Sequence, residues 1–169
     1  LDNVQPPLVI CDGDTREAAE AFRLDQGEIV LFEEMVREEA DDLALQEIHR
    51  RAIDTDPIYI VFTSGSTGIP KGVAACHRSV IDYVEQLSQA LEFGPDTVFG
   101  NQSPLYFDAC LKELYPTIKF GATTYLIPRN LFSMPVKLVE YLNLHRINTI
   151  CWVVSALTMV SAFGTFDTV

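Results

Sequence analysis

The chain has 169 residues, with 24 Asp and Glu against 12 Lys and Arg, a net charge of −12, and 48% hydrophobic residues. This size and composition are typical of one globular domain with a real core and exclude a disordered acidic tail. The acidity argues against nucleic acid and against an anionic membrane surface as partners.

The predicted elements are short and irregular up to residue 57 and regular after it. Strands are expected at 8–12, 29–32, 59–63, 72–76, 97–99, 123–127 and 148–153. Helices are expected at 15–22, 79–91, 108–119, 135–145 and 155–163, with a helix or loop at 33–51. Thr15 and Ser155 are candidate N-caps, and Pro135 suits a first turn. Strands that alternate with helices predict an α/β fold with a largely parallel sheet.

The acidity is confined to the leading part of the chain. Residues 1–57 hold 16 acids and 5 bases, whereas residues 58–169 hold 8 acids and 7 bases. We therefore predict an acidic leading segment, 1–57, and a nearly neutral core, 58–169, within one domain. Both ends lack a closing element, so we expect the chain to be a piece of a longer protein.

Cysteine spacing and hydropathy exclude further classes. The four cysteines lie at least 34 residues apart and show no ligand spacing with the three histidines, which predicts no metal site and a reducing, cytoplasmic location. Residues 147–166 carry no charge and are long enough to cross a bilayer. Their polar residues and the change of pattern at Ser155 favour a buried strand followed by a buried helix.

A Gly/Ser/Thr loop between the strands expected at 59–63 and 72–76 carries the strongest chemical signal. Its hydroxyls and backbone N–H groups are typical of an anion-binding nest, and Lys71 adds a point charge suited to phosphate. Lys71 follows Pro70 and precedes Gly72, so the loop is not a Walker A motif, in which Ser or Thr follows the lysine. A flexible linker would explain neither the lysine nor the flanking strands, so we predict phosphate binding.

The stretch from Tyr59 to Val73 reads Tyr-x-x-Phe-Thr-Ser-Gly-Ser-Thr-Gly-x-Pro-Lys-Gly-Val and is followed by His77. It resembles the signature of the adenylate-forming superfamily, which includes acyl-CoA synthetases, luciferases and the adenylation domains of nonribosomal peptide synthetases. The resemblance implies ATP and Mg²⁺ as cofactors, with catalytic roles for Thr67 and Lys71 at the phosphates. The ATP-binding residues that it implies are Thr63, Ser64, Gly65, Ser66, Thr67, Gly68 and Lys71.

A second motif, Phe-Asp-Ala-Cys-Leu-Lys-Glu, covers residues 107–113. Asp108 lies at an expected helix start, so a first-turn acid or an i,i+4 pair with Lys112 would explain it structurally. The motif resembles the Phe-Asp-x-Ser motif of amino-acid-activating members, with Cys110 in place of Ser. There the Asp holds the substrate ammonium, which implies Phe107, Asp108 and Lys112 as substrate-binding residues. Further motifs at 114–117, 127–135 and 148–155 resemble those of D-alanine–carrier protein ligases, although Val154 stands where Pro is common.

Lys112 raises a question about the substrate. A buried ammonium needs an anionic partner. One hypothesis is the side-chain carboxylate of an acidic amino acid, because Asp108, Ala109 and Lys112 together resemble pockets that accept glutamate. The alternatives are that Lys112 reaches solvent or pairs with Asp108.

The resemblance implies that an amino acid carboxylate is activated with ATP as an aminoacyl-adenylate and transferred to the phosphopantetheine thiol of a carrier protein. The chain would be part of the large N-terminal domain of such a ligase, and we expect it to lack adenylation activity alone. Two alternatives stay open. One is a fragment of an acyl- or aryl-CoA synthetase, which Asp108 disfavours, and the other is a non-catalytic anion-binding module.

Overall fold

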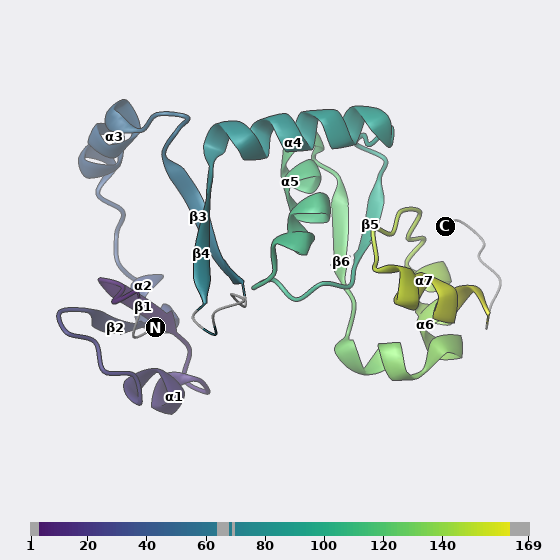
Figure 1. The fold of residues 1–169 in the computed structure, drawn as a ribbon, viewed down its shortest axis with the longest axis horizontal. Helices are drawn as coiled ribbons and strands as arrows, with labels where there is room; N and C mark the ends of the chain where they lie inside the picture. Colours follow the sequence, from purple (N-terminus) through teal and green to yellow (C-terminus); the bar gives the residue numbers. More distant parts are fainter. Residues whose placement is uncertain (1–3, 64–67, 69, 163–169) are drawn as a thin grey trace. The chain divides into compact units, whose positions relative to one another are not determined.

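A computed structural model describes residues 4–63, 68 and 70–162 (Figure 1). The chain divides into two compact units, the first ending at Ala52 and the second beginning at Ile53. This division lies close to position 57, where the acidity ends. That both units belong to one domain of a longer protein stays a prediction.

The first unit is a small βαβ arrangement followed by two helices. Strands β1 (Leu8–Cys11) and β2 (Glu28–Leu31) pair in parallel, and α1 (Arg16–Glu20) lies between them in the sequence. The remaining elements are α2 (Phe32–Met35) and α3 (Asp42–Arg51).

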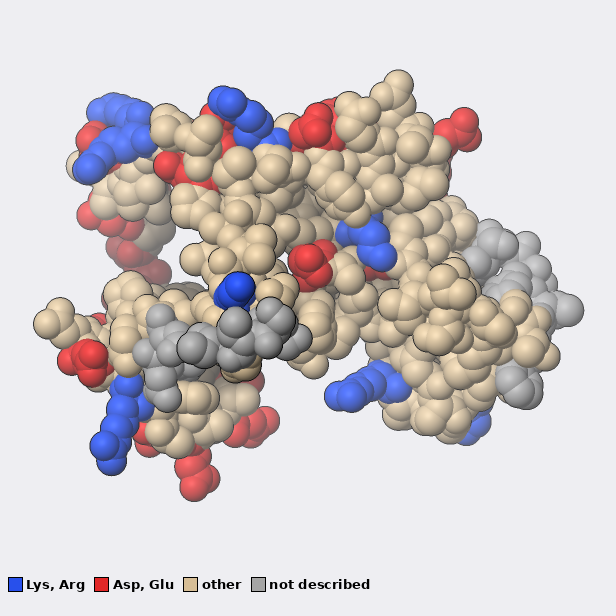
Figure 2. Space-filling model, in the orientation of Figure 1, with Lys and Arg blue, Asp and Glu red and all other residues tan. Residues whose placement is uncertain are grey.

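The ends of α1 and α3 follow the usual capping rules only in part. Thr15 precedes α1 as expected, but its hydroxyl bonds Asp12 and not the helix. Asp41 caps α3 by accepting from the amides of Leu43 and Ala44. All described acids of this unit are exposed, and Figure 2 shows several around α1 and α3. The acidity of the leading segment therefore forms a solvated surface.

The second unit begins with a β-hairpin and a long helix. Strands β3 (Pro57–Thr63) and β4 (Lys71–Cys76) pair antiparallel, with Thr63 opposite Lys71. Helix α4 (His77–Ala90) starts directly after β4. Arg78 in its first turn makes a bidentate ion pair with Asp54, which ties the helix start to the turn before β3.

Parallel pairing returns in the rest of the second unit. Strands β5 (Val98–Asn101) and β6 (Thr123–Leu126) pair in parallel, and the chain crosses between them through a 3₁₀ turn, η1 (Asp108–Cys110), and α5 (Leu111–Phe120). Helix α5 contacts both strands and α4 (Figure 1). The later elements are η2 (Arg129–Ser133), α6 (Pro135–Leu144), which begins at Pro135 as expected, and α7 (Val154–Ser161).

The α/β class and the largely parallel pairing are therefore confirmed, although the described strands form separate pairs. The described strands form three two-stranded sheets, of which two are parallel and one is antiparallel. The antiparallel pair arises because the loop between 63 and 71 is too short for the crossover that a parallel connection needs.

The strand expected at 148–153 is wrong, since only one bridge, between Phe99 and Thr149, joins this segment to β5. Backbone bonds from Asn148 and Thr149 to the Val98 carbonyl and from Gly100 to the Thr149 carbonyl join the segment to β5, and two side chains add to them. The Asn148 side-chain oxygen accepts from the Val98 amide at 2.9 Å, and Trp152 Nε1 donates to the Gly100 carbonyl at 2.6 Å. The prediction that Ser155 caps a helix is also wrong. Helix α7 begins at Val154, so Ser155 lies inside it.

The main core of the second unit lies where α6, α7 and the 147–152 segment meet. Its fully buried members are Leu138, Leu142, Ile147 and Val160. Trp152 packs edge-on against Phe132 at the margin of this core. Among the described helices, none has both the length and the apolar character needed to cross a bilayer.

The glycine that ends α5 gives a direct test of this architecture. Gly121 has φ of 64°, a left-handed conformation that a side chain disfavours. We expect Gly121→Ala to lower the free energy of unfolding by about 1 kcal/mol in urea denaturation. Gly94→Ala is the matched control, because Gly94 also has open space around its Cα but no left-handed φ. Equal stability of the two variants would contradict the assigned helix end.

Candidate functional site

The hairpin loop is described only at its margins. Ser64, Gly65, Ser66 and Thr67 lie outside the described residues, so their roles stay predictions. Thr63 ends β3, Lys71 begins β4 opposite it, and the Thr63 hydroxyl lies 3.5 Å from the Lys71 carbonyl. Gly68 has φ of 80°, which explains why glycine is required there. The hairpin thus brings the two outer residues of the expected phosphate loop to one end of the sheet.

Lys71 is exposed, and no carboxylate of the described residues lies within ion-pair distance of it. A cation without a carboxylate partner at the loop end of β4 fits a phosphate ligand. Among the described residues, no group of three His, Cys, Asp or Glu side chains could hold a metal ion.

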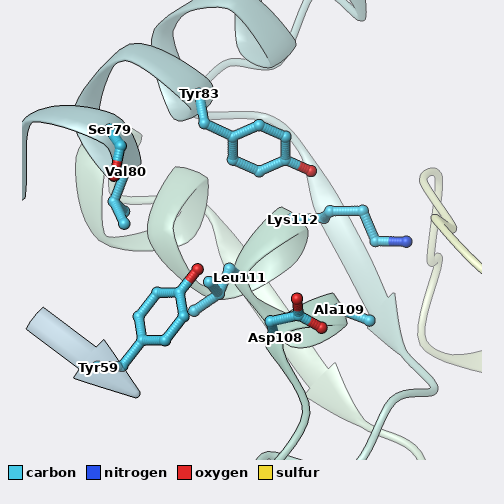
Figure 3. A pocket seen from close by; sticks show the side chains of 8 residues that line it. All are labelled: Tyr59, Ser79, Val80, Tyr83, Asp108, Ala109, Leu111 and Lys112. Carbon is cyan, nitrogen blue, oxygen red and sulfur yellow. The ribbon is translucent and has the colours of Figure 1, made fainter. Parts of the chain in front are cut away.

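A cavity of about 420 Å³ opens beside the hairpin (Figure 3). Four elements build it: β3, one face of α4, the 3₁₀ turn η1, and the start of α5. The residues that line it are Tyr59, Ser79, Val80, Tyr83, Asp108, Ala109, Leu111 and Lys112. Ser79 and Tyr83 are four residues apart and therefore share one face of α4. Two of the three predicted substrate-binding residues, Asp108 and Lys112, thus line the same cavity.

Asp108 is the first residue of η1, where the sequence places a helix start. Its carboxylate is exposed, and within the described chain it forms no ion pair with Lys112. Burial and the negative charge of Asp108 raise the pKa of the Tyr59 phenol, which places the two groups near one another. Asp108 is therefore an anionic group in the cavity that is available to a cation.

Lys112 takes a partner that the sequence did not suggest. Its ammonium donates to the backbone carbonyl of Cys151 at 2.7 Å. In Figure 3 the amine end is directed away from the other cavity side chains. The predicted alternative of pairing with Asp108 is therefore wrong, whereas exposure of the half-buried Lys112 to solvent stays a prediction. A carbonyl satisfies one of three ammonium donors, so the side chain keeps capacity for a further acceptor.

Phe107 does not line the cavity. It is 52% exposed, and its ring packs against Tyr106 with centroids 5.0 Å apart. Its substrate-binding role therefore stays a prediction. Conversely, Tyr59, Ser79 and Tyr83 line the cavity although the sequence did not single them out for a site. Ser79 and Tyr83 have i,i+4 spacing on α4, but this spacing does not distinguish a cavity wall from a face that packs on a core.

A buried polar pair joins β5 to the first turn of α5. Glu113 is 1% exposed, and Asn101 Nδ2 donates to its Oε2 at 2.7 Å. Burial raises the pKa of the Glu113 carboxyl from 4.5 to about 7, while the Asn101 hydrogen bond, the Lys112 charge and the Cys151 backbone lower it. Sequence reasoning missed this pair, because no local pattern distinguishes a buried glutamate from an exposed one on a helix.

With the geometry in place, comparison with known proteins defines the family. The model of the family described as "AMP-binding enzyme" matches residues 1–168, and the chain belongs to this family. It is 36% identical over 114 residues to the L-proline--[L-prolyl-carrier protein] ligase of Pseudomonas fluorescens, which covers 67% of the chain and 23% of that protein. It is 31% identical over 148 residues to the D-alanine--D-alanyl carrier protein ligase of Staphylococcus aureus, which covers 88% of the chain and 29% of that protein.

The structural comparison agrees with the fold. The chain superimposes on the adenylation, ketoreductase and pseudo Asub multidomain structure of a keto acid-selecting nonribosomal peptide synthetase module with a TM-score of 0.77. The identity is 23%, and the match covers 96% of this chain and 14% of that chain. This likeness is one of fold, and it agrees with the expected α/β class. The chain spans about a quarter of the length of the ligases that it matches.

Titration of Glu113 gives a testable pH dependence. The pKa of Glu113 is about 7 in the folded protein and 4.5 in the unfolded chain. Between pH 4.5 and 7, Glu113 is therefore mostly protonated in the folded state and mostly ionised in the unfolded state. The contribution of Glu113 to the free energy of unfolding is therefore largest below pH 4.5, and it falls by about 3 kcal/mol as the pH rises towards 7. Urea denaturation of the wild type and Glu113→Gln should show this decline only in the wild type. Parallel pH curves for the two proteins would contradict the assignment.

Proposed function

We propose that the whole protein activates an amino acid carboxylate with ATP to form an aminoacyl-adenylate, and transfers the acyl group to the phosphopantetheine thiol of a carrier protein. The observation that carries this proposal is the free carboxylate of Asp108 in a cavity beside the Lys71 hairpin. The two relatives named above support it, because their names describe amino acid–carrier protein ligases. We also propose a cytoplasmic location, since all four cysteines are free thiols.

The roles of the chain's own residues follow from charge and position. Asp108 would accept hydrogen bonds from the substrate ammonium and orient the carboxylate outward from the cavity. Lys71, and with it the loop residues 63–68, would neutralise the phosphate oxygens on which negative charge accumulates as pyrophosphate leaves. ATP supplies the electrophilic α-phosphorus, and Mg²⁺ would be held largely by phosphate oxygens, which suits its preference for few protein ligands.

The order of bonds made and broken is the same for any amino acid. A substrate carboxylate oxygen bonds to the α-phosphorus while the bond to the bridging oxygen breaks, and pyrophosphate carries away the electron pair. In the second step the carrier thiolate bonds to the acyl carbon, and AMP leaves with the electrons of the mixed anhydride bond. The protein contributes positioning and charge neutralisation to both steps.

The side chain of the substrate is a separate proposal. Lys112 lines the cavity and retains donors beyond the one used by Cys151, so an acidic side chain remains a proposed substrate class. The two ligase relatives act on proline and D-alanine by name, which favours a small neutral side chain. Pyrophosphate exchange across all amino acids separates these classes. Exchange with D-alanine or proline, and none with glutamate or aspartate, would exclude the acidic class.

An acyl- or aryl-CoA synthetase and a non-catalytic anion-binding module are the competing functions. Asp108 disfavours the first, because an acyl or aryl acid offers no ammonium to a carboxylate in the cavity. An anion-binding module without chemistry would bind ATP but show no carboxylate-dependent pyrophosphate exchange. The two variants below separate these alternatives.

Loss of the Lys71 charge tests the phosphate site. In the full-length protein, Lys71→Ala should lower kcat for adenylation by about 100-fold, because one cation at the developing phosphate charge is lost. Folding should be unchanged, since Lys71 is exposed and makes no side-chain contact among the described residues that the variant would break. Lys137→Ala, at an exposed lysine on α6, is the control and should retain full activity. Equal activity of both variants would exclude a phosphate role for Lys71.

Loss of the Asp108 charge tests the amino acid site. Asp108→Asn keeps the shape of the side chain but removes the anion, so we expect kcat/KM for the amino acid to fall by about 100-fold. The KM for ATP should change little, because the nucleotide does not need this carboxylate. Asp82→Asn, an exposed acid on α4 that does not line the cavity, is the matched control. An unchanged kcat/KM in Asp108→Asn would favour the acyl- or aryl-CoA synthetase alternative.

A further inference from the structure

The loop that carries Asp108 has a buried hydrogen bond at its base. The chain leaves β5 at Asn101, passes through exposed residues from 104 to 108, and enters α5 at Leu111. Asn101 and Glu113 flank this excursion, and the 2.7 Å bond from Asn101 Nδ2 to Glu113 Oε2 joins its two ends. Asn101 is 5% exposed and Glu113 is 1% exposed, so the bond is sheltered from water.

Asp108 depends on this base for its position. Its carboxylate forms no ion pair with the described residues, so we attribute its place mainly to the backbone. That backbone is fastened near its end by the Lys112 bond to the Cys151 carbonyl and by a weak contact from the Cys110 thiol to the Leu105 carbonyl at 3.7 Å. Among the hydrogen bonds of the described residues, the Asn101–Glu113 bond alone links the strand before the loop to the helix after it through two side chains.

The polar contacts of Glu113 extend into the sheet. The Thr117 hydroxyl, one turn further along α5, donates to the Glu113 carbonyl and contacts the Thr124 hydroxyl of β6. The first turns of α5 are therefore held by β5, β6 and the 148–152 segment at once. Removing the Glu113 carboxyl would leave the Asn101 amide buried without its acceptor, which is more costly than removing both groups.

We propose that the Asn101–Glu113 hydrogen bond is the clamp that fixes the Asp108 loop, and that Glu113 is therefore a positioning residue for the substrate ammonium. The second part of this inference rests on the proposed function. The first part concerns the loop itself and is tested independently of activity.

Substitutions of Glu113 and Asn101 in the full-length protein test the positioning role. The KM is measured for the amino acid that supports pyrophosphate exchange. Glu113→Ala should raise the KM for the amino acid about ten-fold and leave the KM for ATP within about two-fold. Glu113→Gln should keep a near-normal KM, because its amide oxygen still accepts from Asn101. Asn101→Ala removes the donor but leaves Glu113 in place. If Glu113→Ala does not fold, the same rise in the KM for the amino acid is expected in Asn101→Ala. Equal changes in both KM values would overturn the positioning role.

The pH profile adds a readout that a purely structural residue would not move. Cys110 and Lys112 lie beside Glu113 on its own segment, Cys151 faces it from the 148–152 segment, and Tyr83 interacts with it electrostatically from α4. Ionisation of Glu113 above about pH 7 strengthens the hydrogen bond from Asn101 but places a charge in a buried site, and this cost should loosen the first turn of α5 and raise the wild-type KM for the amino acid. Glu113→Gln should lack that rise. The same rise in both proteins would overturn the proposal.

Hydrogen exchange tests the clamp without reference to activity. Backbone amides of residues 105–112 should exchange about ten-fold faster in Glu113→Ala or Asn101→Ala and at the wild-type rate in Glu113→Gln. Ser88→Ala is the control, because Ser88 is 4% exposed on α4 and its hydroxyl has no partner among the described residues. Unchanged exchange in both clamp variants would overturn the clamp. If the wild type shows no amino-acid-dependent pyrophosphate exchange, the proposed function is contradicted. The hydrogen-exchange rates would still show whether the Asn101–Glu113 bond holds the loop.

Discussion

The attachment of α5 to its neighbours is the constraint on which the second unit depends. This helix carries one buried carboxyl, Glu113, and a lysine whose ammonium is turned inward to a backbone carbonyl. Neither group is stable in a protein interior without a partner. Asn101 from β5 and Cys151 from the following segment supply those partners, so satisfying two polar side chains also fixes the helix against the sheet.

The candidate site follows from that attachment. Because α5 is fixed at its first turn, the 3₁₀ turn before it holds Asp108 at the mouth of a cavity whose other walls come from β3 and α4. The hairpin that supplies Tyr59 to this cavity also carries Lys71, the first residue of β4. One short hairpin therefore links the proposed amino acid site to the proposed phosphate site, and both lie in residues 58–169, the part of the chain that is nearly neutral.

Local sequence patterns predicted most elements and the placement of Asp108. Helical spacing located α4 and α6, and the Pro135 start was correct because proline is favoured in a first turn. The segment at 148–153 was misassigned, since β-rich composition says nothing about whether a side chain such as Asn148 will occupy the ladder positions. The partners of Lys112 and Glu113 were also beyond reach, because Cys151 and Asn101 are 39 and 12 residues away and no periodicity joins them.

The central claim is that Asp108 binds the ammonium of an amino acid within reach of the phosphate loop. A crystal structure of the full-length protein with a non-hydrolysable aminoacyl-adenylate analogue tests it most directly. The account predicts the ammonium nitrogen within about 3 Å of an Asp108 carboxylate oxygen and the phosphate group on the Lys71 side of the cavity. An ammonium bound by other groups, with the Asp108 carboxylate facing solvent, would contradict it.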